Sequence, residues 1–261
     1  MTAPTITPEL KALLRRVKLG KTLDTLPERL TLARQNRLEH AEFLELVLAD
    51  EVDRRNRQAA TVRARAAKLD PAMTLEAWDP DTTVTYDLAL WAELTSLRFV
   101  DDARGVFVLG PVGVGKTHLA HALGHIACRR GHKVHAERAD RLFKRLKAAR
   151  LDHTYDTELR RLIAVDVLII DDFALQTHDA TQTTDFYEIA VERHLKSATV
   201  ITSNRTPDEW LAALADPLLA QSAIDRLQST AWELIVEGES YRRRQKPTLN
   251  PTQTNHKETR R

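Results

Sequence analysis

The segment 110–117, Gly-Pro-Val-Gly-Val-Gly-Lys-Thr, completes the phosphate-binding pattern G-x-x-x-x-G-K-[ST]. In this pattern, backbone N–H groups bind the α- and β-phosphates of a nucleotide, and the N-terminus of the following helix adds partial positive charge. Lys116 is expected to reach the β- and γ-phosphate oxygens, and the Thr117 hydroxyl is expected to ligate Mg²⁺. The sequence therefore predicts an ATP or GTP site made by Gly110, Pro111, Val112, Gly113, Val114, Gly115, Lys116 and Thr117.

Two carboxylates and an amide occur later in the chain, at positions that suit hydrolysis. Asp171 and Asp172 follow an apolar run at 167–170. We expect Asp171 to hold Mg²⁺ through its outer shell and Asp172 to act as the general base that orients the attacking water. Two neighbouring acids at the end of a buried strand are costly unless a cation offsets their charge. Asn204 follows the apolar run 199–202, and its amide is expected to sense the γ-phosphate.

A parallel sheet is expected to position these side chains. Apolar runs alternate with segments long enough to hold crossover helices, which is typical of an α/β domain. The expected strands are 106–109, 133–136, 167–170, 199–202 and 234–236. We expect the strand that leads to Asn204 to lie between the phosphate-loop strand and the strand that leads to Asp171.

The first third of the chain is expected to be helical. Residues 30–68 contain neither Gly nor Pro, and an apolar stripe recurs there at helical spacing. The stripe consists of Leu44, Val47, Leu48 and Val52. Turn-forming residues in 69–83 predict a boundary, so we expect a helical N-terminal domain at 1–75, an α/β domain at 76–246 and a disordered tail at 247–261.

Positive charge is concentrated in two segments. The net charge is only +2, yet residues 129–150 hold nine Lys and Arg against two acids, and residues 242–261 hold seven against one. Such a distribution favours a polyanion partner. The helix expected at 139–150 has an apolar face and an opposite basic face, and we predict that the basic face contacts the backbone of duplex DNA. Its basic residues are Arg141, Lys144, Arg145, Lys147 and Arg150. A merely solvated face is the alternative. For the arginines at 54–65 the order is reversed: a solvated face is the main interpretation, and a DNA or partner surface is the alternative.

Five motifs together resemble the IstB-like ATP-binding proteins, which help insertion-sequence transposases and are related to the DnaC and DnaI helicase loaders in the AAA+ superfamily. The resemblance spans about residues 5 to 246 and includes parts of the helical N-terminal third. The motifs are Gly110–Thr117 with His118-Leu119-Ala120, Leu168–Phe173, Ile201–Arg205, Ile224–Leu227 and Glu237–Arg242.

The resemblance implies further site residues. Arg226 is similar to an arginine finger that acts on the nucleotide of a neighbouring subunit, although a surface ion pair with Asp225 is the alternative. Arg242 is similar to a second sensor acting within the same subunit, with the next two arginines as competing candidates, and His118 would join the nucleotide site. This chain departs from the family's usual glycine at Ala174, which bears on the conformation of that loop.

The resemblance also implies a function. We expect a DNA-binding AAA+ ATPase that uses ATP and Mg²⁺, assembles with copies of itself on duplex DNA and assists or regulates a cognate transposase. The alternatives are a replicative helicase loader and a nucleotide-gated DNA scaffold that scarcely hydrolyses ATP. The chain lacks both an apolar run of about 18 residues and a signal-peptide stretch, so we expect no membrane partner and a cytoplasmic location.

His118, His121 and His125 recur along one helix face, but no carboxylate or Cys at ligand spacing joins them, so a metal site is not predicted there.

Overall fold

Five parallel strands form one sheet in the order β2-β3-β4-β1-β5. The computed structural model describes residues 6–79 and 83–241. The strands are β1 Val106–Leu109, β2 Val134–Arg138, β3 Val167–Asp171, β4 Ala198–Ser203 and β5 Trp232–Ile235. All five expected strands are therefore confirmed, each with ends within two residues of the prediction, and β4 does lie between β1 and β3.

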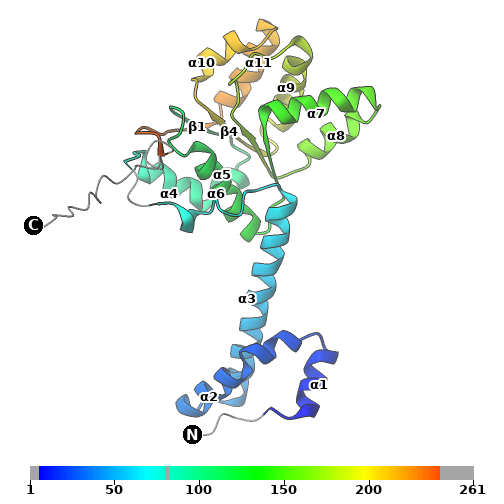
Figure 1. Cartoon of the computed structure of the whole chain (residues 1–261), viewed down its shortest axis with the longest axis vertical. Coiled ribbons are helices and arrows are strands. Elements are labelled where there is room, and N and C mark those ends of the chain that lie inside the picture. The colour runs from blue at the N-terminus through cyan, green and yellow to red at the C-terminus, as the bar shows by residue number, and fades with distance from the viewer. Residues whose placement is uncertain (1–5, 80–82, 242–261) are drawn as a thin grey trace, which may run out of the picture.

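Helices cover both faces of this sheet and form a separate unit at the N-terminus (Figure 1). They are α1 Pro8–Arg16, η1 Gly20–Asp24, α2 Leu26–Asn36, α3 His40–Ala66, η2 Leu75–Ala77, α4 Leu88–Ser96, α5 Arg98–Asp101, α6 Lys116–Arg129, α7 Ala139–Leu151, α8 Tyr155–Ile163, α9 Ala180–Arg193, α10 Pro207–Trp210, η3 Leu211–Ala213 and α11 Pro217–Gln228. Within residues 6–79 and 83–241, no helix is long and apolar enough to cross a membrane.

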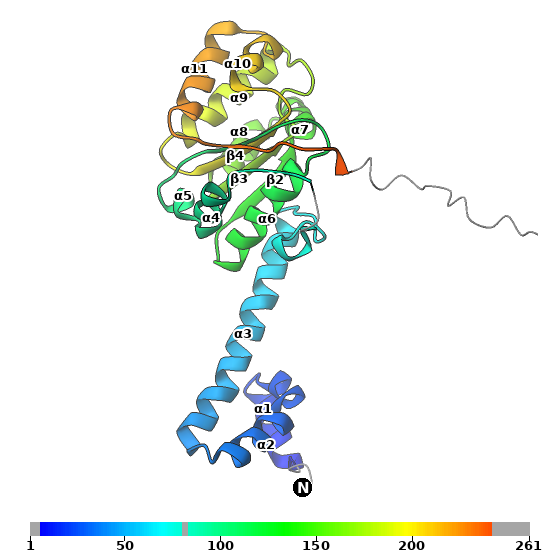
Figure 2. The ribbon, with the colours of Figure 1, turned by 90° about the vertical axis from the view of Figure 1, so that its left-hand side faces the viewer.

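The sheet separates two hydrophobic cores. Alternate residues of each strand point to opposite faces, so Val106 and Val108 join one core while Phe107 and Leu109 join the other. The first core lies under α4, α5, α6 and the end of α3, and the second lies under α7 to α11. Figure 2 shows α6 below the sheet and α9 and α11 above it. The result is a three-layer α/β/α domain whose polar site residues follow the carboxyl ends of the strands.

Helix α3 carries the N-terminal helices away from the α/β domain (Figures 1 and 2). The segment 30–68, although it contains neither Gly nor Pro, is not one helix: it breaks near Arg37, which ends α2 in the left-handed region at φ 54°. A capping box then starts α3, with the Glu39 N–H donating to the Glu42 carboxylate at 2.8 Å. The left-handed Arg37 and the capping box therefore end one helix and start another without any Gly or Pro. The expected division of the chain at residue 75 stays a prediction, because α3 contacts both parts.

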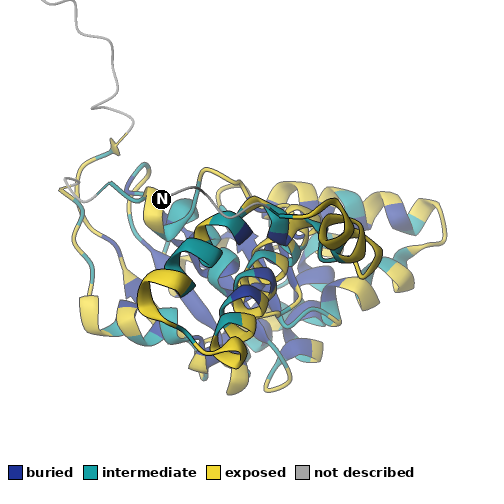
Figure 3. Cartoon of the chain, turned by 90° about the horizontal axis from the view of Figure 1, so that it is seen from below, coloured by how far each residue is buried: buried dark blue, intermediate teal, exposed yellow. Residues whose placement is uncertain are grey.

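The apolar stripe of α3 is mostly open to solvent. Val47 is buried, whereas Leu44, Leu48 and Val52 are 56%, 40% and 55% exposed. Helix α1 has no buried residue at all. Figure 3, in which exposed residues are yellow, shows how much of these helices is uncovered. The helical periodicity was correctly predicted, but most of the stripe does not pack within this chain.

A buried arginine of α9 hydrogen-bonds the end of α8 and the start of β4. Arg193, at the end of α9, is 1% exposed, and its Nη1 donates to the carbonyl oxygens of Leu162 at 2.8 Å and Val165 at 2.9 Å. Its Nε donates to Thr199 Oγ1 at 3.0 Å. Burial lowers the pKa of this guanidinium to about 10, so it remains charged near neutral pH. Arg193 therefore serves the fold rather than a ligand.

We expect Arg193→Met to lower the free energy of unfolding by about 3 kcal/mol, because it leaves several buried carbonyl groups without a donor. The change would appear as a lower urea midpoint in circular dichroism. Arg161→Met is the matched control, since Arg161 is exposed on the neighbouring α8. Equal midpoints for the two variants would contradict a structural role for Arg193.

Candidate functional site

The phosphate loop joins β1 to α6 in the conformation that its glycines permit. Gly113 and Gly115 have φ angles of 90° and 94°, which side-chain-bearing residues rarely adopt. Gly115 caps the N-terminus of α6, and Lys116 and Thr117 are the first two residues of that helix. The Lys116 side chain folds back into the loop, with its Nζ donating to the Pro111 carbonyl oxygen at 2.7 Å. The loop therefore presents an ammonium group and a helix N-terminus together.

The C-terminal segment closes over this loop. The Tyr241 N–H donates to the Gly113 carbonyl oxygen at 2.9 Å. A Cβ atom added to Gly113 would lie 2.2 Å from Ser240 Oγ, so only glycine fits beneath this segment. Arg242, the predicted second sensor, lies outside the described residues. The chain that precedes it nevertheless runs directly across the phosphate loop.

The two predicted Mg²⁺ ligands, Thr117 and Asp171, form a hydrogen-bonded group with Thr202. Asp171 is 5% exposed, and its Oδ1 accepts from Thr117 Oγ1 at 2.9 Å and from Thr202 Oγ1 at 2.5 Å. Carboxylate and hydroxyl oxygens suit Mg²⁺, which is usually held by one or two carboxylates together with water and phosphate oxygens. The donor set and the glycine-lined loop therefore fit Mg²⁺ and a nucleoside triphosphate.

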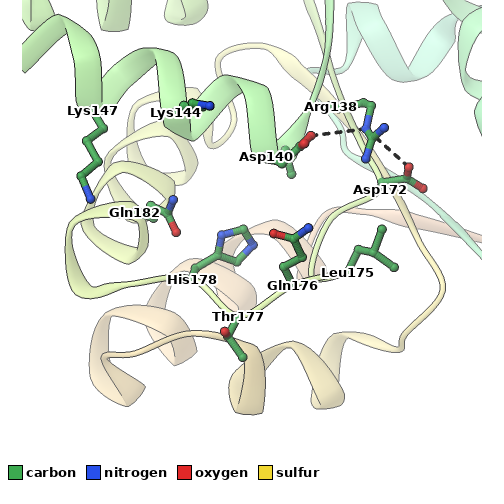
Figure 4. A pocket seen from close by; sticks show the side chains of 11 residues that line it. Arg138, Asp140, Lys144, Lys147, Asp172, Leu175, Gln176, Thr177, His178 and Gln182 are labelled. Atoms are coloured by element: carbon green, nitrogen blue, oxygen red, sulfur yellow. Dashed lines mark ion pairs between the residues drawn. The ribbon is translucent and has the colours of Figure 1, made fainter.

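Asp172, the predicted general base, lies beside an arginine that sequence analysis did not select. Its backbone N–H donates to Thr202 Oγ1 at 2.9 Å, and its side chain is 41% exposed. Arg138 Nε lies 3.7 Å from Asp172 Oδ2 and 3.3 Å from Asp140 Oδ1 (Figure 4). The register of the sheet explains the contact, because Arg138 ends β2 directly opposite Asp171 at the end of β3.

Sheet register also places Asn204 at the phosphate loop. Ser203 pairs with Leu109 across β4 and β1, so Asn204 is level with Gly110, where the loop begins. The residue is exposed. The geometry is therefore consistent with the predicted sensor role, and the same edge of the sheet also carries Asp171 and Asp172.

Arg226 lies on α11, in the helix layer opposite α6 (Figure 2). Its Nη1 donates to the Ser222 carbonyl oxygen at 2.7 Å, and its guanidinium carbon lies 6.0 Å from the centre of the Tyr187 ring. The arginine is therefore not brought together with the phosphate loop across the sheet of its own subunit. The predicted role of Arg226 on a neighbouring subunit stays a prediction, and this placement is compatible with it.

Helix α7 buries its apolar face as expected, but its basic residues fall into two groups. Arg141, Lys144 and Lys147 are exposed, and Lys147 Nζ lies 3.3 Å from Asp179 Oδ2. Lys144 and Lys147 also line a pocket of about 460 Å³ next to Asp172 (Figure 4).

Arg145 and Arg150 are engaged inside the protein. Arg145 bridges Glu137, at 2.7 Å, and Glu158. Burial alone would raise the pKa of Glu137, but its hydrogen bonds with His135, Arg145 and Lys68 outweigh burial and hold that pKa well below its usual range. Arg150 pairs with the buried Asp185, and its guanidinium carbon lies 3.7 Å from the centre of the Tyr155 ring. The α7 surface open to a ligand is thus formed by Arg141, Lys144 and Lys147.

Two residues of the site were missed from the sequence. Thr202 hydrogen-bonds both Asp171 and the Asp172 backbone, and it is fully buried. A hydroxyl residue inside an otherwise apolar central strand was the available signal. Arg138 had no such signal, because its contact with Asp172 depends on the β2–β3 register.

Comparisons with known proteins identify the family of this chain. Residues 12–248 match the sequence model of the family described as IstB-like ATP binding protein. A protein described as an ATP-binding protein in an insertion sequence of Mycobacterium tuberculosis is 38% identical over 92% of this chain and 96% of its own length. The insertion sequence IS21 ATP-binding protein of Pseudomonas aeruginosa is 33% identical over 91% of this chain and 90% of its own length.

Solved structures show the same fold at lower sequence identity. The replication initiator DnaA bound to AMPPCP and single-stranded DNA has a TM-score of 0.53 at 23% identity, covering 66% of this chain and 51% of that one. DnaI has a TM-score of 0.53 at 22% identity, covering 63% of this chain and 90% of that one. With a phosphate loop on a five-stranded parallel sheet and a family match over most of its length, the chain belongs to the IstB-like ATP-binding proteins.

Proposed function

We propose that this protein hydrolyses ATP at the edge of the sheet formed by the phosphate loop, Asp171, Asp172 and Asn204. The observation that carries the proposal is the hydrogen bond from Thr117 Oγ1 to Asp171 Oδ1 at 2.9 Å, which brings the two predicted Mg²⁺ ligands together. Bound Mg²⁺ would offset charge on the β- and γ-phosphates. Lys116 would bind the phosphates, Asp172 would accept the proton of the attacking water, and Asn204 would orient that water.

The same proposal includes duplex DNA, a transposase and other copies of this chain as partners, acting in the cytoplasm. Relatives whose alignments cover more than nine-tenths of this chain are named as insertion-sequence ATP-binding proteins, which supports a function together with a transposase. The exposed lysines and arginine of α7 support contact with a DNA backbone. Arg226 supports assembly, because a guanidinium supplied by a neighbouring subunit would stabilise charge on the transferred phosphoryl group.

Steady-state ATP hydrolysis with and without long duplex DNA tests this function. We expect stimulation by DNA and a rate per subunit that rises with protein concentration, because neighbouring subunits must meet for Arg226 to act. An Arg226→Ala variant should lose this stimulation while keeping ATP binding. A wild-type rate that depends on neither DNA nor concentration would contradict the assembly-dependent ATPase.

Replacing Arg141, Lys144 and Lys147 with Ala is expected to weaken duplex binding and its salt dependence. The slope of log K against log salt is negative, and each lost phosphate contact reduces its magnitude by about 0.9. For three lost contacts the magnitude should therefore decrease by about 2.7. Fluorescence anisotropy with a labelled duplex over a salt series measures it. Replacing Arg160, Arg161 and Lys196, which are exposed on other elements, removes the same charge as a control. An equal loss of slope in both triple variants would show that total charge, rather than α7, sets the binding.

The Arg138–Asp172 contact favours a second candidate function, a nucleotide-gated DNA scaffold with little hydrolysis. A guanidinium 3.7 Å from the carboxylate competes with water for its oxygens. Single-turnover hydrolysis on DNA separates the two: a scaffold would bind ATP and DNA together while leaving the nucleotide intact for many minutes.

Helicase loading remains the alternative that keeps the fold and changes the partner, and co-sedimentation of the full chain with a replicative helicase tests it.

A further inference from the structure

Residues 67–79, here called the linker, join α3 to the α/β domain and lie along α6. The Ala67 carbonyl oxygen accepts from the Ala136 N–H of β2 at 2.8 Å. The Leu69 side chain packs so closely on α6 that a Cβ atom added to Gly124 would lie 2.8 Å from it. One turn earlier, Arg63 Nε donates to the Cys128 carbonyl oxygen at 2.8 Å. The end of α3 is therefore fastened to the helix that begins at the phosphate loop.

The three histidines of α6 hydrogen-bond the next part of the linker, between the end of α3 and the nucleotide site. His125 Nε2 lies 2.8 Å from the Asp70 carbonyl oxygen, and His118 Nε2 lies 2.8 Å from the Thr74 carbonyl oxygen. A carbonyl oxygen only accepts, so both rings carry hydrogen on Nε2. His121 Nδ1 accepts from the Asp70 N–H at 3.0 Å, and burial lowers the pKa of this ring, which keeps the acceptor available. The spacing that resembles a metal site is thus used to hold the linker.

Trp78, near the end of the linker, rests on the phosphate loop itself. A Cβ atom added to Gly115 would lie 2.7 Å from the indole ring. The ring also packs edge-on against His118, with 5.1 Å between ring centres. Gly115 immediately precedes Lys116 and Thr117, which are expected to bind the phosphates and Mg²⁺. A shift of the loop when nucleotide binds must therefore move Trp78 or open this contact.

At its other end, α3 holds the N-terminal helices firmly. Arg29 of α2 makes two hydrogen bonds to the Asp50 carboxylate, at 2.6 and 2.9 Å, and Arg55 donates to the Lys18 carbonyl oxygen at 2.7 Å. Helix α3 has 27 residues, which at 1.5 Å per residue is about 40 Å. A rotation of about 5° at its base would move its tip by about 3.5 Å. A small change at the phosphate loop is thereby enlarged at the N-terminal helices.

We propose that the linker, through Trp78 and the α6 histidines, couples the nucleotide state of the phosphate loop to the position of the N-terminal helices. The inference rests on the proposed binding of nucleotide at Gly110–Thr117. Coupling is reciprocal, so a partner that holds the N-terminal helices in one position also changes nucleotide affinity. The exposed apolar residues of α1 and α3 would then take a different position in each nucleotide state, and a partner that binds them would distinguish the two states.

A distance measurement in the full chain tests the coupling. Spin labels are placed on Asn36→Cys and Arg160→Cys, both exposed, in a Cys128→Ser background; Cys128 is buried, and burial raises its pKa to about 11. Distances are compared with saturating ADP and with saturating AMPPNP, each with Mg²⁺. We expect the two distributions to differ by about 3.5 Å, the displacement that a rotation of about 5° produces at the tip of α3.

Variants test the route. The double variant His121→Ala/His125→Ala and the variant Trp78→Ala should lose the nucleotide-dependent difference, whereas Trp78→Phe should retain it. His153→Ala, at an exposed turn, is the control and should also retain it. Equal distances with both nucleotides in the parent, with saturation shown by fluorescent-nucleotide titration, would overturn the coupling alone. An unchanged difference in His121→Ala/His125→Ala and Trp78→Ala would overturn the route, and failure of the parent to bind either nucleotide would overturn the proposed function as well.

Discussion

Lys116→Ala is expected to weaken ATP binding by at least about 100-fold, which corresponds to about 2.7 kcal/mol. Lys116 is 7% exposed, and its ammonium group lies inside the phosphate loop, where Nζ contacts the Pro111 carbonyl oxygen at 2.7 Å. Attraction to phosphate oxygens is strong there because little water competes with the charge. Titration with a fluorescent ATP analogue in the presence of Mg²⁺ measures the loss.

The control for this experiment is Lys144→Ala, which removes the same charge from the exposed face of α7. It should leave ATP affinity unchanged within about twofold, because a solvated charge outside the loop is screened by salt. Both proteins should melt at similar temperatures. Wild-type affinity in Lys116→Ala would remove the lysine from the nucleotide site, and an equal loss in both variants would point to a general charge effect.

Much of the fold was predictable because its strands are apolar throughout. The run Val167–Ile170 is buried on both faces of the sheet, so it had to be a central strand, and Asp171 and Asp172 had to follow at its carboxyl end. Parallel connectivity then brings the ends of β1, β3 and β4 to one edge. The predicted positions of Lys116, Asp171 and Asn204 follow from that rule without any knowledge of side-chain contacts.

The contacts between elements were not predictable in the same way. Arg138 meets Asp172, and Arg145 meets Glu137 and Glu158, only once the register of β2 and the packing of α7 are set. A basic helix face looks the same in sequence whether its charges are solvated or paired with acids from another element. Three of the five predicted DNA contacts, Arg145, Lys147 and Arg150, therefore lie in ion pairs that periodicity does not reveal, although Lys147 stays exposed.

The histidine spacing on α6 illustrates the same limit. Residues at i, i+3 and i+7 share one helix face, but sequence does not show what covers that face. In the structure, the covering segment is the linker, whose backbone groups at Asp70 and Thr74 provide the hydrogen-bond partners. The polar histidines therefore do structural work beside the nucleotide site. Backbone partners from a distant segment carry no side-chain signature, so neither a motif nor a period identifies them.

Asp172→Asn is expected to keep ATP binding within about twofold and to lower single-turnover hydrolysis by at least about 100-fold, because an amide is a far weaker proton acceptor than a carboxylate. The backbone should tolerate the change. Asp172 has a φ of 54°, a conformation that Asn adopts more readily than most residues, and the bond from its N–H to Thr202 Oγ1 remains available.

Asp140→Asn is the matched control, because Asp140 lines the same pocket and shares Arg138 with Asp172. If Asp172 acts as the base, Asp140→Asn should retain most of the wild-type rate. Equal losses in both variants would instead assign the effect to the disturbed position of Arg138. Full turnover in Asp172→Asn would exclude this carboxylate as the base. Asp140 and Asp172 both contact Arg138. Comparing the two variants therefore separates the loss of proton transfer from a change in the electrostatics around that arginine.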